Sequence, residues 1–147
     1  MTVLIDADGC PVVDIAVKLC CNYQIPCLLL CDTAHQLQRP GAETLVFDKG
    51  SDSVDYALVR RVAPGDTVIT QDYGLAAMCL ARSARVLHQD GWEYTNDNIE
   101  ALLFQRHAAR KHRAAGGRTK GQAKRKGSQD AAFAAALEAV LQTTVQG

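Results

Sequence analysis

The sequence predicts a single α/β domain, a three-layer sandwich with a five-stranded parallel sheet and helices on both faces. The chain has 147 residues, of which 48% are hydrophobic and 22% are charged, and this is enough for one globular domain with its own core. Short apolar runs alternate with longer stretches of helical character, as in βαβ units. The runs are mostly continuously apolar, which is typical of strands buried on both faces.

Five strands and three crossover helices are predicted in chain order. The strands are short apolar runs, each ending in an aspartate, at 3–6, 26–32, 44–48, 67–72 and 85–90. The intervening stretches have the length of right-handed crossover helices and lie at 12–22, 51–63 and 73–84. Residues 36–43 form a longer loop without a helical pattern.

The C-terminal third differs in character from the rest. We expect a basic helix over 97–115, a mobile basic loop over 116–129 and a C-terminal helix over 130–142, all within one domain spanning 1–147. The loop is rich in glycine and lysine and contains no bulky apolar side chain, so it buries too little surface to offset the entropy of ordering. The last helix carries apolar residues at helical spacing, which predicts that it docks on the domain: Phe133, Leu137, Val140 and Leu141.

Charge divides the chain into two parts although its net charge is zero. Residues 1–100 contain 14 acidic and 7 basic side chains, whereas residues 101–147 contain 2 acidic and 9 basic ones. This asymmetry favours an anionic partner, nucleic acid first, although the two parts also neutralise each other. No apolar run approaches the ~18 residues of a membrane span, and the N-terminus has no basic leader, so we expect a cytoplasmic protein without a membrane partner.

Carboxylates gather at one predicted edge of the sheet. In an open parallel sheet, ligands bind beyond the carboxyl ends of the strands, where the strand order reverses. Aspartates after strands are often helix caps or turn formers, and we expect that role for those at 32, 48 and 90. Crowded carboxylates are instead tolerated where a cation neutralises them, and oxygen ligands favour Mg²⁺ or Mn²⁺. The predicted metal ligands are Asp6, Asp8, Asp52, Asp55 and Asp72.

Basic side chains of the C-terminal part are the candidate nucleic-acid contacts. Cations that gather phosphates bind without reading sequence, and RNA is the expected partner. Each of these side chains is about as well explained by a solvated surface. The candidates are Arg110, Lys111, Arg113, Arg118, Lys120, Lys124, Arg125 and Lys126. Trp92 and Tyr94 are expected to cover the core, with base stacking as the second interpretation.

Three ordered motifs carry a family resemblance over nearly the whole chain. They are DADGCP after the first strand, VITQDYGLA around the fourth, and NIEALLFQRHAARKHRAAGGRTKG near the C-terminus. With them the chain resembles the bacterial YaiI/YqxD family, which is grouped with the PIN-like domains. The resemblance implies strand order 3-2-1-4-5 and a metal-dependent ribonuclease. It also implies that Asp6, Asp72 and Asp55 are the shared acids, with Asp52 as the alternative helix acid, and that Asp8 belongs to the family's own motif.

Three functions follow from these patterns. The first is a divalent-metal-dependent nuclease that acts on single-stranded RNA, with Asp6, Asp8, Asp55 and Asp72 as catalytic residues. The second rests on the similarity of VLIDADG to the nucleophile motif of haloacid-dehalogenase phosphatases, in which Asp6 attacks phosphate, Asp8 acts as acid and base and Thr33 supplies a hydroxyl. The third is a non-catalytic RNA-binding protein.

Overall fold

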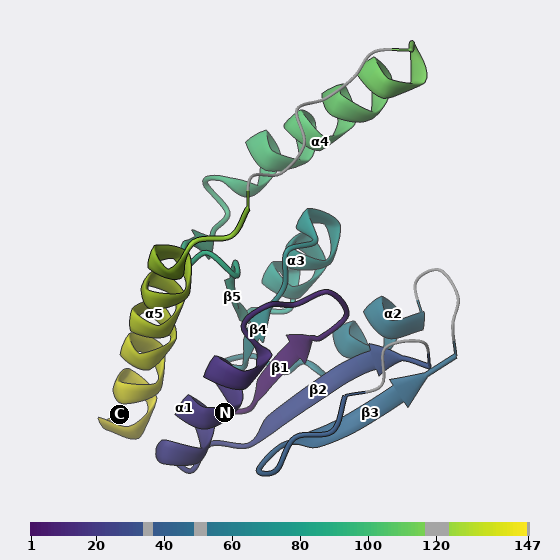
Figure 1. The fold of residues 1–147 in the computed structure, drawn as a ribbon. Helices are drawn as coiled ribbons and strands as arrows, with labels where there is room; N and C mark the ends of the chain where they lie inside the picture. The colour runs from purple at the N-terminus through teal and green to yellow at the C-terminus, as the bar shows by residue number, and fades with distance from the viewer. Residues whose placement is uncertain (34–36, 49–52, 117–123, 147) are drawn as a thin grey trace.

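A six-stranded sheet forms the centre of the part of the chain that the structure describes (Figure 1). The computed structural model describes residues 1–33, 37–48, 53–116 and 124–146. The strand order is β3-β2-β1-β4-β5-β6, and all pairs are parallel except β5 with β6. The α/β class is therefore confirmed, as is the order 3-2-1-4-5 for the parallel strands. The strands are β1 (Val3–Asp6), β2 (Cys27–Asp32), β3 (Glu43–Phe47), β4 (Thr67–Ile69), β5 (Arg85–Leu87) and β6 (Glu93–Tyr94).

The prediction of a five-stranded, wholly parallel sheet was wrong, because a short antiparallel sixth strand extends the sheet. A tight turn follows β5, in which the Gly91 N–H donates to the His88 carbonyl and the His88 N–H donates to the Trp92 carbonyl. Gly91 has a φ of 93°, and a Cβ there would lie 2.6 Å from backbone atoms of Ala132, so only glycine suits this turn. Asp-Gly is a hairpin signal, and it accounts for the antiparallel return of the chain.

Two helical layers cover the sheet. One face carries α1 (Val13–Asn22) and α5 (Gly127–Gln146), and the other carries α2 (Ser53–Arg61) and α3 (Tyr73–Ala81). Each layer has its own buried cluster, so the strands are buried on both faces as their continuous apolar runs predict. No helix in the described ranges has the length and apolarity to cross a membrane.

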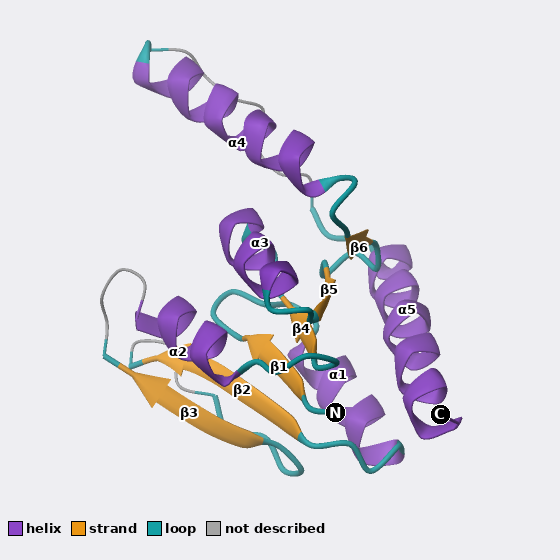
Figure 2. Ribbon diagram, turned by 180° about the vertical axis from the view of Figure 1, so that it is seen from behind, coloured by secondary structure: helices purple, strands orange, loops and turns teal. Residues whose placement is uncertain are grey.

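The helix α4 (Ile99–Ala114) extends away from the body, as Figure 2 shows from behind. Within α4 only Ile99 is buried, and the aromatic side chain of Phe104 is 72% exposed. By contrast, α5 buries the four apolar side chains at 133, 137, 140 and 141. Half of the loop predicted at 116–129 lies outside the described residues, which resume at 124, and α5 begins within the predicted loop, at Gly127, rather than at 130.

Candidate active site

Asp6 stands at the carboxyl end of β1, at the reversal of strand order between β2 and β4. Its Oδ2 accepts a hydrogen bond of 2.8 Å from the Thr70 hydroxyl. Burial raises the pKa of Asp6 from 3.8 to about 6, and repulsion by Asp55, Asp72 and Asp8 adds to the rise, while the Thr70 hydrogen bond opposes it. Asp8, Asp55 and Asp72 therefore lie close enough to Asp6 to disfavour its charged form.

Thr70 links Asp6 to Asp72. The Thr70 side chain is buried, and its oxygen also accepts the Asp72 backbone N–H at 3.0 Å. This turn ends β4 at Ile69, so the strand predicted over 67–72 is shorter than expected. The chain then enters α3 directly, and Asp72 becomes the residue that precedes the helix.

Asp72 caps α3, a role that the sequence predicted for the aspartates at 32, 48 and 90 but not for Asp72. Its Oδ1 accepts the backbone N–H groups of Gly74 at 2.8 Å and Leu75 at 3.2 Å. The Arg106 guanidinium of α4 donates to the same oxygen at 3.2 Å. A Cβ on residue 74 would lie 3.0 Å from Arg106 Nη1, so glycine leaves room for this ion pair.

The other predicted acids are placed as follows. The Asp8 carboxylate accepts the Asp32 backbone N–H at 3.2 Å, which ties the loop after β1 to the end of β2. Asp55 lies in the first turn of α2, half-buried. Asp52 lies outside the described residues. Asp90 follows β5 by three residues and pairs with Arg125, so β5 does not end in the expected aspartate.

The donor chemistry of this edge suits a hard divalent cation, because its candidate ligands are carboxylate oxygens. In the described ranges, no three His, Cys, Asp or Glu side chains are grouped closely enough to form a metal site by themselves. Mg²⁺, however, is usually held by one or two carboxylates together with water and substrate phosphates. Asp6 together with one neighbouring carboxylate could supply the one or two carboxylate ligands that Mg²⁺ takes from a protein.

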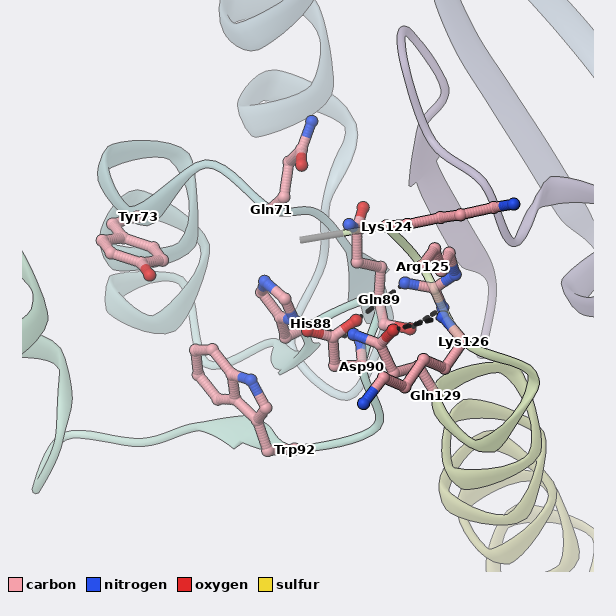
Figure 3. Close-up of a pocket in the computed structure, with 10 residues that line it drawn as sticks. All are labelled: Gln71, Tyr73, His88, Gln89, Asp90, Trp92, Lys124, Arg125, Lys126 and Gln129. Atoms are coloured by element: carbon pink, nitrogen blue, oxygen red, sulfur yellow. Dashed lines mark hydrogen bonds and ion pairs between the residues drawn. The ribbon is translucent and has the colours of Figure 1, made fainter. Parts of the chain in front are cut away.

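Two hollows open next to the acidic edge and share Gln71 and Tyr73. The larger, of about 660 Å³, lies between the β5–β6 turn and the start of α5 (Figure 3). The smaller, of about 480 Å³, lies between Asp72 and α4 and is also lined by Gln105, Arg106, Ala109 and Arg113. They adjoin at these two residues, and we refer to the two hollows together as the groove. Asp72 lines the smaller hollow, whereas Asp6 lines neither of them.

The predicted basic residues divide between two places. Arg110, Lys111 and Arg113 are exposed on α4, with Arg113 in the smaller hollow, and Lys124 and Lys126 are exposed beside the larger one. Arg125 is instead a structural clamp, because it donates to Asp90 at 2.7 Å, Asp130 at 2.7 Å and the Gln89 carbonyl at 2.8 Å. Arg118 and Lys120 lie outside the described residues.

Comparison with known proteins decides the family. The model described as "Uncharacterized BCR, YaiI/YqxD family" matches residues 4–143. This chain belongs to the YaiI/YqxD family. A UPF0178 protein of Exiguobacterium sibiricum is 50% identical over 141 residues, 96% of each chain, and one of Ruminiclostridium cellulolyticum is 45% identical over 147 residues, all of this chain and 96% of its own. No solved structure matches the chain.

In this YaiI/YqxD chain, sequence reasoning missed two residues of the candidate site. Thr70 lies two residues before Asp72, and a hydroxyl at that spacing is a known turn former that binds the following backbone. Arg106 lies within the predicted basic helix, but no sequence signal places that helix beside Asp72, so the ion pair was not predicted. Burial raises the pKa of the Cys10 thiol to about 11, which disfavours its thiolate form at neutral pH.

Proposed function

We propose that this protein hydrolyses phosphodiester bonds of single-stranded RNA with a divalent cation bound at Asp6. The observation that carries the proposal is the place of Asp6 at the end of β1, where the strand order reverses and Asp55, Asp72 and Asp8 lie close enough to help raise its pKa to about 6. A carboxylate that is costly to ionise at neutral pH is maintained more readily where a bound cation offsets its charge.

The proposed cation is Mg²⁺ or Mn²⁺. Asp6 would hold it with a neighbouring carboxylate, Asp8, Asp55 or Asp72, and with water and RNA phosphates as the remaining ligands. Such an ion neutralises phosphate oxygens and lowers the pKa of bound water. The Thr70 hydroxyl positions the Asp6 carboxylate by its hydrogen bond to Oδ2.

The groove beside Asp72 supports RNA as the substrate. Its cations lie at both ends, Arg106 and Arg113 in the smaller hollow and Lys124 and Lys126 in the larger one. Between them lies Tyr73, and Trp92 lines the larger hollow. Cations spaced along aromatic side chains are typical of proteins that bind single strands by their backbone and bases.

A second candidate is RNA binding without hydrolysis. It is favoured by the contacts of Asp72, whose Oδ1 is already bound by two backbone N–H groups and Arg106. That network stabilises α3 and its contact with α4 without any cation. The same groove then serves as a binding surface only.

Mn²⁺ titration by calorimetry, with cleavage of end-labelled single-stranded RNA, tests the proposal. We expect wild type to bind Mn²⁺ and cleave, and Asp6→Asn to lose at least about 100-fold in activity, since removing even an outer-shell partner costs 10–100-fold. Asp97→Asn is the matched control, because Asp97 is exposed at the start of α4. Cleavage that survives chelation or Asp6→Asn would contradict the proposal.

Other results of the same experiment identify the alternatives. Salt-sensitive RNA binding without metal-stimulated cleavage would indicate the binding protein. A phosphoryl group trapped on Asp6 from a phosphate ester would indicate phosphatase chemistry.

A further inference from the structure

The larger hollow combines an aromatic wall, amide side chains and cations. Its aromatic residues are Tyr73, His88 and Trp92, and its amides are Gln71, Gln89 and Gln129 (Figure 3). Three cationic side chains, at 124, 125 and 126, stand against a single lining carboxylate, that of Asp90. The lining is therefore suited to a ligand that is flat, polar at its edges and anionic.

The aromatic wall is fixed before any ligand binds. The Trp92 ring stacks on His88 with centroids 4.4 Å apart and planes within 12° of parallel. Behind them lies Tyr94, fully buried, with its ring 4.6 Å from that of Trp92 and its hydroxyl donating to the Thr70 carbonyl. A rigid platform loses little side-chain entropy on binding, so its stacking energy is retained.

His88 contributes to this platform as a neutral ring. Burial lowers the pKa of His88, and this exceeds the opposing effect of Asp90. Its Nδ1 accepts the Asp90 backbone N–H at 3.0 Å, which leaves Nε2 as the protonated nitrogen. The positive charge of the hollow therefore comes from Lys124, Arg125 and Lys126, just before α5, rather than from this histidine.

The start of α5 is clamped to the platform. Arg125 spans from Asp130 of α5 to Asp90 and the Gln89 carbonyl of the β5–β6 turn. The Gln129 side chain accepts the Lys126 backbone N–H at 2.7 Å. These contacts place the exposed Lys124 and Lys126 at the rim opposite the aromatic wall, within one hollow of about 660 Å³, a volume in the range of small-molecule sites.

We propose that this hollow binds one nucleotide unit, with its base stacked on Trp92 and its phosphate at Lys124 and Lys126. The amides of Gln71, Gln89 and Gln129 offer both donors and acceptors to the edge of the base. That this nucleotide unit belongs to an RNA strand rests on the proposed function. A free nucleotide has the same chemistry, and the test separates the two.

Trp92 is the only tryptophan of the chain, so its fluorescence reports on this hollow alone. The titration is done in EDTA, without metal, using a short oligoadenylate, adenosine monophosphate and ribose 5-phosphate. We expect the oligonucleotide to quench Trp92 and the base-free ribose 5-phosphate to leave it unchanged. Equal quenching by the mononucleotide indicates a free nucleotide as ligand, and much weaker quenching indicates a strand. Oligonucleotide binding without a change in Trp92 emission would overturn the assignment, as would no binding at all.

Variants measured by anisotropy of a labelled oligonucleotide provide the second readout. Trp92→Leu is expected to weaken binding roughly 5- to 150-fold, the range for the loss of one stacked base, and Trp92→Phe to retain most of it. Tyr56→Leu is the matched control, because Tyr56 is an exposed aromatic residue on α2 outside the hollow. If Trp92→Leu unfolds, Lys126→Gln replaces it, with weaker binding and a smaller salt dependence expected. Unchanged affinity in folded Trp92→Leu would reject the assignment.

Failure here is distinguishable from failure of the proposed hydrolysis. Quenching of Trp92 without Mn²⁺-dependent cleavage would reject the nuclease and leave the nucleotide site standing. Mn²⁺-dependent cleavage lost in Asp6→Asn but accompanied by unchanged Trp92 emission would reject only the nucleotide site.

Discussion

The ends of the neighbouring strands β1 and β4 carry two aspartates in opposite circumstances. Asp72 accepts hydrogen bonds from two backbone N–H groups of α3 and from the Arg106 guanidinium, so it caps the helix and forms an ion pair. Asp6 is half-buried, has the Thr70 hydroxyl as its hydrogen-bond donor among the described residues, and faces the repulsion of three carboxylates. At neutral pH, Asp72 therefore stabilises the folded protein, whereas the charge on Asp6 destabilises it.

This difference indicates which aspartate the fold itself requires. A helix cap is explained by the stability it contributes, so Asp72 requires no further function. The charged Asp6 side chain at neutral pH lowers the stability of the fold, because its buried surroundings favour an uncharged side chain. Stability therefore does not explain why an aspartate stands at this position. A residue that lowers the stability of the fold in this way is a candidate functional residue, because groups with shifted pKa values and strained groups cluster at functional sites.

The largest expected effect is a gain in stability for Asp6→Asn. The rise of the Asp6 pKa from 3.8 to about 6 corresponds to up to about 3 kcal/mol favouring the protonated form. Asparagine mimics that form, so the variant is expected to unfold at a higher denaturant concentration than wild type at pH 7.5. Equal or lower stability of Asp6→Asn at that pH would remove the distinction between the two aspartates.

The difference in stability between wild type and Asp6→Asn depends on pH, and the raised pKa of Asp6 determines the direction of that dependence. Between about pH 4 and 6 the folded protein binds the Asp6 proton and the unfolded chain releases it. Wild type therefore loses stability relative to Asp6→Asn as the pH rises through this window, and the gap is constant above it. Denaturant unfolding of both proteins at several pH values measures the gap directly, and added Mn²⁺ is expected to narrow it at pH 7.5 by stabilising only wild type.

Asp72 is expected to respond in the opposite sense. Asp72→Ala removes the acceptor for the Gly74 and Leu75 N–H groups and is expected to cost about 1–2 kcal/mol of unfolding free energy. Asp72→Asn keeps a good capping side chain and serves as the matched control, with a loss below about 1 kcal/mol. A stabilising effect of Asp72→Ala would show that the cap and the ion pair do not outweigh the repulsion at this edge.

The sequence was sufficient to predict the parallel part of the sheet, because continuous apolar runs separated by helical stretches are compatible with few chain topologies. It was not sufficient for β6, since Glu93 and Tyr94 are too few to show a periodic pattern, and only the Asp90–Gly91 turn signals them. The capping role of Asp72 depends on where β4 ends. That end is set by the Thr70 hydroxyl, a contact that apolar patterning does not report.

The two C-terminal helices show the same limit. Both carry apolar side chains at helical spacing, yet α5 packs against α1 while α4 leaves Phe104 exposed. The pattern predicts an amphipathic helix in each case, and burial depends on whether another element lies opposite that face. Consequently the sequence predicted the docking of α5 correctly but did not predict that α4 would reach Asp72 with Arg106.

Arg106→Gln is expected to have the smallest effect on stability and tests whether α4 belongs to the acidic edge. Arg106 and Asp72 are each about one-third exposed, with side-chain values of 35% and 33%, so the ion pair is worth at most about 1 kcal/mol.

The effect of Arg106→Gln on RNA binding is expected to be larger than its effect on folding. If Arg106 also contacts a phosphate, the slope of log affinity against log salt falls by ~0.7, the value for one single-strand contact. Arg60→Gln on α2 is the matched control, because Arg60 is exposed and outside both hollows. An unchanged salt slope in Arg106→Gln, with α4 still folded by circular dichroism, would assign Arg106 to the capping network alone and leave the groove with Arg113 as its cation on the α4 side.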